Sequence, residues 1–183
     1  MAIYAIFLAP LEQLLMGQIR ADIMWLAEKD VLEIGTGSGI NFRYYNFNKI
    51  SNVTSLDLAY PEKLAQQYPE ISFVTWSIEE LPFEDNRFDT VVVSLVLCSV
   101  DAEKSLLEIK RVLKPGGRLI FLEHVKPTGK LAGRIADGLN PLWAKAANGC
   151  NLNRPTGELL KQAGFFELNI REKGVFRYGY GKF

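Results

Sequence analysis

A glycine-rich run, EIGTGSG at residues 33–39, carries the clearest chemical signal in the sequence. It follows the apolar segment 31–34, which is typical of a short buried strand, and we expect a helix to begin after it. Glycines let the backbone turn sharply and approach a ligand closely. The N–H groups at a helix start favour polar or anionic ligand groups. The run therefore predicts a ligand-binding turn, with a purely structural turn as the alternative.

An acidic residue, Asp57, stands twenty residues after Gly37, where a second strand over residues 52–58 is expected to end. A carboxylate in that place accepts two hydrogen bonds from ribose hydroxyls. Together, the turn and the acid predict a site for an adenosine-containing cofactor. The spacing is G-x-G-x-G, with Ile40 in place of the third glycine of a nicotinamide-type loop, and the G-K-[ST] of a P-loop is absent.

Four further side chains are candidates for chemistry. His124 follows an apolar strand expected over residues 118–123, at the edge where ligands bind in open α/β sheets. It is a candidate general base or acceptor-orienting residue, with a packed histidine as the alternative. Glu123 is a second candidate, with a role as partner of His124 as the alternative. We expect Cys98 and Cys150 to be small buried residues rather than nucleophiles.

Another candidate, Arg154, is either a surface charge or an anchor for an anionic acceptor.

The composition of the chain narrows the classes of function that it could have. The 183 residues include 21 Lys and Arg and 21 Asp and Glu, so no basic excess indicates a nucleic-acid partner. One histidine, two cysteines and no CxxC pair argue against a metal site. The hydrophobic share of 48% is typical of a globular domain.

Alternating strands and helices must position these residues. We expect strands at 31–34, 52–58, 71–76, 88–97 and 118–123, and a closing pair at 165–172 and 175–183. We expect helices at 11–26, from an Asp101 cap to Leu113, and from a Thr156 cap over 157–163 to Gly164. This order predicts an α/β fold: a Rossmann-like doubly wound sheet of about seven strands. It is mostly parallel, with an antiparallel C-terminal strand and helices on both faces.

We expect a single domain over residues 1–183. It divides into an N-terminal cap helix at 1–28, a cofactor-binding core at 29–125, an irregular acceptor-side insertion at 126–155, and a C-terminal helix and strand pair at 156–183. The nine apolar residues at 1–9 are too few to span a bilayer and lack the features of a signal peptide. They pack on the core or touch lipid. Tyr4 and Phe7 are candidate lid residues, with core packing the favoured role of Phe7. The expected location is the cytoplasm.

Several ordered motifs resemble those of class I S-adenosylmethionine-dependent methyltransferases of type 11. They are the E-x-G-x-G-x-G run, EELPF at 79–83, NRFD at 86–89 and RVLKPGG at 111–117. Four further segments are similar to one branch, which holds the bacterial ubiquinone/menaquinone-biosynthesis type and the thiol S-methyltransferases. These segments are VLCSV at 96–100, EHV at 123–125, NPLW at 140–143 and GCNL at 149–152.

The resemblance implies S-adenosyl-L-methionine as cofactor and S-adenosyl-L-homocysteine as product. The cofactor-binding residues that it implies are Glu33, Gly35, Thr36, Gly37, Ser38, Gly39, Asp57, Leu58, Ser77, Ile78, Ser94 and Leu95. One departure stands at Trp76-Ser77-Ile78, where the family often has Gly-Asp-Ala with the Asp on the adenine amino group. A neutral Ser77 contact is roughly half as strong as a charged one.

The expected function is methyl transfer to a small, partly apolar acceptor that is a thiol, amine, hydroxyl or quinol. The segment 94–97 reads SLVL, without the proline-containing motif of nucleic-acid amino-methyltransferases. One alternative is a lipid or quinone-ring methyltransferase in peripheral contact with a membrane, favoured by residues 1–9 and Trp143. The other is a non-catalytic cofactor-binding module. The sequence predicts no particular oligomeric state.

Overall fold

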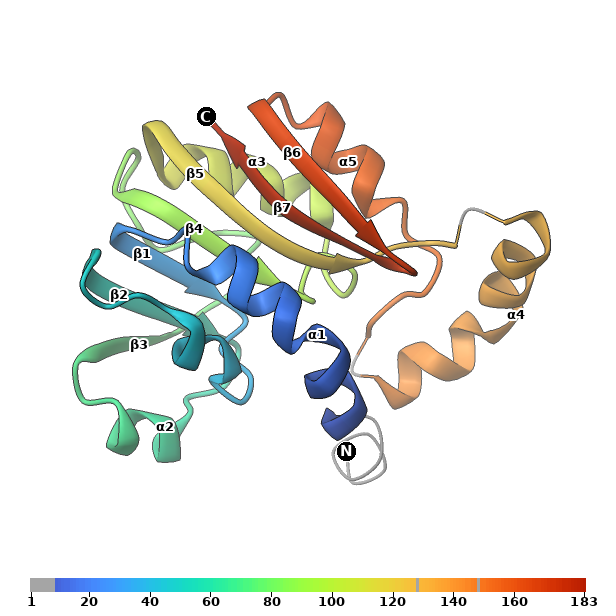
Figure 1. Cartoon of the computed structure of the whole chain (residues 1–183), viewed down its shortest axis with the longest axis horizontal. Helices are drawn as coiled ribbons and strands as arrows, with labels where there is room; N and C mark the ends of the chain where they lie inside the picture. Colours follow the sequence, from blue (N-terminus) through green and yellow to red (C-terminus); the bar gives the residue numbers. More distant parts are fainter. Residues whose placement is uncertain (1–8, 128, 148) are drawn as a thin grey trace.

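The computed structural model describes residues 9–127, 129–147 and 149–183. Its centre is one seven-stranded sheet (Figure 1). The strands are β1 (Lys29–Ile34), β2 (Ile50–Asp57), β3 (Ile71–Thr75), β4 (Phe88–Ser94), β5 (Leu113–His124), β6 (Phe166–Lys173) and β7 (Phe176–Lys182). They lie in the order β3-β2-β1-β4-β5-β7-β6.

Strands β1 to β5 pair in parallel, and β7 pairs antiparallel with both β5 and β6. The predicted mostly parallel sheet with a closing antiparallel pair is therefore confirmed. Val91, Val92 and Val93 of β4 are all fully buried. A strand covered on both faces needs apolar side chains in both directions, which explains why β4 has no alternation of polar and apolar residues.

Helices cover both faces of the sheet (Figure 1). On one face, Leu106 and Ile109 of α3 (Ala102–Val112) and Leu160 of α5 (Thr156–Gln162) belong to one buried cluster. On the other face, Ile23 of α1 (Ala9–Met24) and Phe42 of the 3-10 helix η2 (Ile40–Tyr44) belong to a second. The short α2 (Glu62–Gln67) lies beside β3. This arrangement confirms the expected doubly wound fold.

The segment predicted to be irregular, 126–155, contains a helix of 17 residues, α4 (Lys130–Ala146). That part of the prediction is wrong. Gly133, Gly138 and Pro141 are helix-weakening residues, and they obscured the helical spacing of the apolar residues between them. Figure 1 shows α4 standing out from the rest of the fold after β5.

Three helix starts can be compared with the predicted ones. The Asp101 cap is confirmed, because its carboxylate accepts a hydrogen bond from Lys104 N at 3.1 Å. The Thr156 cap is wrong: α5 begins at Thr156 itself, after Pro155. The buried hydroxyl of Thr156 has no hydrogen-bond partner in the described part of the chain. The helix expected after the glycine run is only the five-residue η2, too short for an appreciable helix dipole.

Two strand bounds also differ from expectation. Strand β4 ends at Ser94 rather than at residue 97, because Leu95 adopts a left-handed φ of 58° that turns the chain out of the sheet. Strand β5 begins at Leu113, five residues early. The apolar run at 1–9 with Tyr4 and Phe7 lies outside the described residues, apart from Ala9, which begins α1. No helix in the described ranges is long and apolar enough to cross a membrane.

Candidate cofactor and acceptor site

The glycine turn follows β1 at the edge of the sheet where the parallel strands end. Gly35, Gly37 and Gly39 have φ angles of 80°, 51° and 68°, in the left-handed region that glycine adopts without strain. A Cβ on Gly35 would lie 2.3 Å from Cγ2 of Val96, in the loop after β4. A Cβ on Gly37 would meet nothing closer than Gly35 O at 4.0 Å. Gly35 is therefore required for packing, whereas the space beside Gly37 is open to a ligand.

Asp57, at the end of β2, is bound to this turn. Its Oδ2 accepts a hydrogen bond from Gly37 N at 2.9 Å, and its Oδ1 accepts one from Leu58 N at 2.7 Å. A carboxylate has about four lone-pair sites, so both oxygens can accept further bonds from a ribose. An open depression of about 330 Å³ adjoins the turn, lined by Gly37, Ser38 and residues 60–64. The predicted pairing of turn and acid is present in the fold.

Glu33 lies beneath the turn with its carboxylate buried. It accepts hydrogen bonds from Asn41 Nδ2 at 3.0 Å and from the Tyr45 hydroxyl at 2.5 Å. Burial raises the pKa of Glu33 to about 7, although these two hydrogen bonds and the nearby Arg20 lower it. Since both carboxylate oxygens already have protein partners, Glu33 supports the turn by holding η2 against β1.

A buried arginine on α1, Arg20, was missed by the sequence analysis. It donates a hydrogen bond to Ser94 Oγ at 3.0 Å and another to Asn41 Oδ1. The signal in the sequence was a charged residue inside the apolar stripe that contains Ile19 and Ile23. Arg20 brings positive charge to the carboxyl end of β4, close to the carboxylate of Glu33.

The other predicted residues at the turn differ in whether their side chains are buried or exposed. The Thr36 hydroxyl is buried and shares a hydrogen bond of 2.7 Å with Ser55 Oγ, so only the backbone of Thr36 is left for a ligand. Ser38 is exposed at the depression. Leu58 is exposed beside Asp57. Thr36 is thus a support of the turn, and Ser38 and Leu58 stay accessible.

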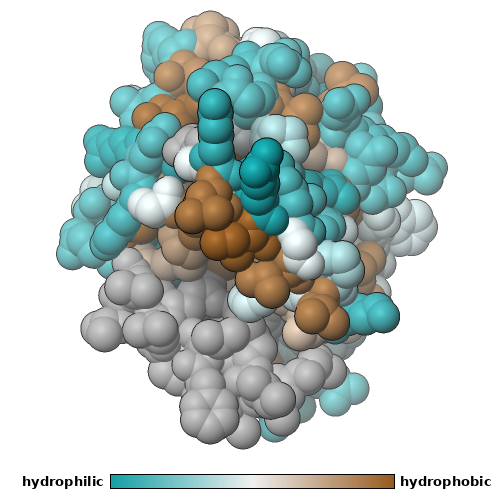
Figure 2. Space-filling view, turned by 90° about the vertical axis from the view of Figure 1, so that its right-hand side faces the viewer, coloured by the Kyte–Doolittle hydropathy of each residue, from teal (hydrophilic) through white to brown (hydrophobic). Residues whose placement is uncertain are grey.

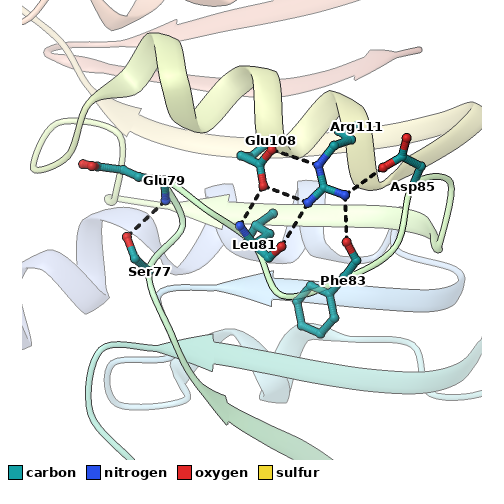
Figure 3. Close-up of polar contacts among 7 residues, drawn as sticks. All are labelled: Ser77, Glu79, Leu81, Phe83, Asp85, Glu108 and Arg111. Atoms are coloured by element: carbon teal, nitrogen blue, oxygen red, sulfur yellow. Dashed lines mark hydrogen bonds and ion pairs between the residues drawn. The ribbon is translucent and has the colours of Figure 1, made fainter.

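The EELPF and RVLKPGG motifs meet in a clamp around Arg111 (Figure 3). The Arg111 guanidinium donates to Leu81 O at 2.9 Å and to Phe83 O at 2.7 Å, and it pairs with Glu108 and Asp85. Glu108 in turn accepts a hydrogen bond from Leu81 N at 2.7 Å. These contacts raise the pKa of Arg111 and lower that of Glu108. The clamp fastens the loop after β3 to α3.

Ser77 and Ile78 lie in the loop that this clamp holds. Ser77 Oγ accepts a hydrogen bond from Glu79 N at 3.2 Å, as Figure 3 also shows. Ile78 is buried in the core. The Ser77 hydroxyl can still donate a hydrogen bond while it accepts this one.

Glu123 holds the loop that follows β4. Its Oε1 accepts hydrogen bonds from Val96 N at 3.0 Å and from Leu97 N at 3.1 Å. The carboxylate is fully buried, and burial raises the pKa of Glu123 to about 7. Its Oε2 has no hydrogen-bond partner among the residues described. Glu123 therefore positions the loop at the acceptor side, whose first residue is Leu95.

His124 ends β5 and lies on the other face of the sheet. Its ring packs edge-on against Phe176 of β7, with the ring centroids 5.7 Å apart. Its Nδ1 is buried without a hydrogen-bond partner within the described ranges. Burial lowers the pKa of His124, which keeps the imidazole neutral at pH 7. The expectation that Glu123 partners His124 is wrong, because neighbouring side chains of a strand point to opposite faces.

The cysteines and Arg154 join the same loop to residues 149–154. Cys98 is buried, and a hydrogen bond with Cys150 and burial raise the pKa of its thiol, which disfavours the thiolate that a nucleophile needs. Asn151 N donates to Cys98 O at 3.0 Å. Arg154 donates to the carbonyl oxygens of Leu97 and Val100. Arg154 therefore has a structural role: it connects the segment 149–154 to the loop after β4, and it is neither a free surface charge nor an exposed anchor for an anion.

The predicted site residues thus gather along one edge of the sheet. The turn, Asp57 and Ser94 follow β1, β2 and β4, whose parallel pairing places their carboxyl ends together. His124 ends β5 at the same edge. In the described part of the chain, no cluster of three or more His, Cys, Asp or Glu side chains could hold a metal ion. The arrangement provides a ligand-binding turn beside a short acceptor-side loop.

Comparison with known proteins identifies the same region. The family model described as a methyltransferase domain matches residues 32–121. Thiol S-methyltransferase TMT1B of Rattus norvegicus is 35% identical over 158 residues, which cover 78% of this chain and 62% of the rat protein. The C-methyltransferase UbiE of Hahella chejuensis is 40% identical over 88 residues, 47% of this chain and 35% of that protein. The chain thus spans about three fifths of the length of TMT1B.

Solved structures share the fold at low sequence identity. An O-methyltransferase family protein from Burkholderia thailandensis superposes with a TM-score of 0.73 at 15% identity, over 93% of this chain and 55% of that one. A SAM-dependent methyltransferase from Aquifex aeolicus gives a TM-score of 0.67 at 20% identity, over 93% of this chain and 92% of that one. At these identities the likeness establishes the fold alone.

Proposed function

We propose that this chain, whose residues 32–121 match the model of the methyltransferase domain family, transfers a methyl group from S-adenosylmethionine to the sulfur of a small, partly apolar thiol. The observation that carries the proposal is the open space beside Gly37, next to the Asp57 carboxylate. When bound, the cofactor supplies a methyl group that is already activated on a sulfonium. The protein therefore has chiefly to position and desolvate the reactants.

The residues present fit this cofactor. Asp57 keeps free lone pairs for ribose hydroxyls, and the exposed backbone of Gly37 and Ser38 offers hydrogen-bonding groups to the amino-acid end. Arg20 donates a hydrogen bond to Ser94 and so holds this residue at the carboxyl end of β4. Ser77 supplies a neutral contact where the family often has an acid. A modest cofactor affinity is the expected consequence.

A thiol suits this acceptor side better than an unactivated hydroxyl or a carbon acid. A few per cent of a thiol with a pKa near 8.5 is ionised at neutral pH, so little base is required. Glu123 is engaged with backbone N–H groups and is not available as that base. The relative TMT1B, at 35% identity, is named a thiol S-methyltransferase. His124 is the candidate to orient the acceptor or accept its proton, since its neutral ring has a buried Nδ1 without a partner within the described ranges; a packed histidine is the alternative.

Incubation with methyl-deuterated cofactor tests the proposal. The purified protein is offered matched thiol, amine, hydroxyl and quinol acceptors, and products are measured by mass spectrometry. We expect a labelled methyl group on the thiols, and none when the variant Asp57→Ala is used. Labelling of the quinol instead would assign the protein to ring or lipid methylation. Tight cofactor binding without any product would make it a binding module. The expected cytoplasmic location stays a prediction.

A further inference from the structure

Helix α4 exposes a stripe of four large apolar side chains. Leu131, Ile135, Leu139 and Leu142 are 74%, 52%, 52% and 71% exposed. Their spacing of four, four and three residues places them within one face of the helix. Figure 2 views the side of the molecule on which α4 lies and shows a contiguous apolar patch near its centre, with hydrophilic residues above it. On the surface of a globular protein, a large contiguous apolar patch usually marks a binding site.

Unbalanced positive charge accompanies the stripe. Lys130, Arg134 and Lys145 lie on α4, and none of them forms an ion pair with another described residue. The one acid in the helix sequence, Asp137, is paired with Lys126 at 2.9 Å. The helix therefore presents an apolar face together with cations whose charge no neighbouring acid offsets.

We propose that α4 binds the surface of an anionic phospholipid membrane, with the apolar stripe among the acyl chains and the cations at the headgroups. An amphipathic helix with leucines on one face and Lys and Arg on the other binds such an interface in this way. The positive charge of α4 argues against a second copy of the chain as the partner that covers the stripe. Antiparallel pairing of two α4 stripes about a two-fold axis would place cations beside cations. A lipid surface instead supplies the missing negative charge.

Hydrogen bonds connect this surface to the acceptor side of the site. Asn140 of α4 donates to Asn151 Oδ1 at 3.0 Å and accepts from Leu152 N at 2.7 Å. Asn151 donates to Cys98 O at 3.1 Å, in the loop that Glu123 holds. The opposite face of the helix that would carry the membrane contact is therefore bonded, through Asn151, to the acceptor-side loop. Acceptors that dissolve in lipid would reach the site from the bilayer.

Vesicle co-sedimentation of the full chain, without methyl donor, tests this inference apart from the proposed function. The vesicles are phosphatidylcholine alone or phosphatidylcholine with phosphatidylserine. The test variant is the pair Ile135→Asp and Leu139→Asp, at positions half exposed and so tolerant of a polar residue. The matched control is Leu107→Asp, because Leu107 is 69% exposed on α3 and outside the stripe.

We expect the native chain and the control to sediment with anionic vesicles, and the stripe variant to partition about tenfold more weakly. Replacing Lys130 and Arg134 by Glu should weaken binding to anionic vesicles. Circular dichroism and melting temperature verify that each variant is folded. Equal sedimentation of native chain and stripe variant would overturn the inference. So would a dimer on gel filtration that the stripe variant abolishes, because a second copy would then cover α4.

Discussion

The side chains of Glu123 and His124 lie on opposite faces of β5, although the two residues are neighbours in the chain. Glu123 accepts a hydrogen bond from Val96 N at 3.0 Å, on the face covered by α3 and α5. His124 packs edge-on against Phe176, on the face covered by α1. The two residues therefore cannot act as an acid–histidine pair, and each has to be tested by itself.

Glu123→Gln should change how stability depends on pH. Burial raises the pKa of Glu123 from 4.5 to about 7, so the folded protein holds a proton that the unfolded chain has lost in this range. Its stabilising contribution is present below pH 4.5 and is lost as the pH rises through about 7, by an amount on the order of 3 kcal/mol. Melting temperatures of both proteins between pH 5 and pH 8 measure this. An equal slope for native and variant would refute the shift.

Asp57→Ala should weaken cofactor binding about a hundredfold, since hydrogen bonds to a charged acceptor contribute about 1.5–3 kcal/mol each. Part of the loss comes from the turn, because Asp57 Oδ2 also accepts from Gly37 N. Asp57→Asn keeps one acceptor oxygen and should lose about tenfold. Titration calorimetry with S-adenosylmethionine gives the affinities. Unchanged binding in the alanine variant would remove Asp57 from the site.

Gly37→Val should abolish cofactor binding in a protein that still folds. A side chain there meets no atom closer than 4.0 Å, so the cost to folding is that of the left-handed φ, about 1–2 kcal/mol. Gly116→Val is the matched control, because Gly116 has a φ of 79°, open space around it and a position near the start of β5, away from the turn. The control should lose similar stability and bind normally in calorimetry. Loss of binding in both variants would point to a general effect on the fold.

The sequence predicted what depends on local spacing. The glycine turn, Asp57 and the succession of strands and helices along the chain follow from motifs a few residues long, and the structure brings the turn and Asp57 together. Arg111 shows the limit: its motif is recognisable, but its role as a clamp on Leu81 and Phe83 depends on contacts between distant segments. Helix α4 was missed because Gly138 and Pro141, which weaken helices, obscured the helical spacing of its apolar residues. Arg20 was missed because nothing local marks a buried cation as a partner of Ser94.

Arg111→Met should destabilise the protein by about 2–4 kcal/mol, because the backbone oxygens of Leu81 and Phe83 lose their hydrogen bonds. Lys161→Met is the control, since Lys161 pairs with Glu158 on an exposed surface and contributes little. Urea unfolding gives both free energies. If the clamp is structural, cofactor affinity per folded molecule stays close to native. A selective loss of affinity at unchanged stability would instead make Arg111 part of the binding site.

His124→Ala separates three roles for the single histidine. If His124 is the base, the variant should lose about 10²–10⁴ in methylation rate and keep its cofactor affinity. Native activity should then fall as the pH drops through the lowered pKa of His124, because the protonated ring cannot accept a proton. If His124 orients the acceptor, the loss should appear chiefly in the KM for the acceptor.

A packed histidine predicts the third pattern, in which the melting temperature falls and activity per folded molecule is unchanged. The edge-on contact with Phe176 gives His124 a packing role that all three readings share, so a loss of stability alone does not decide between them. His124→Phe keeps a ring against Phe176 while it removes both nitrogens. Full activity in that variant would exclude a role for Nδ1. Inactivity with native stability would establish that role. If the variant lacks only the base, its activity towards a thiol acceptor should return at a higher pH, because the thiol then ionises without help.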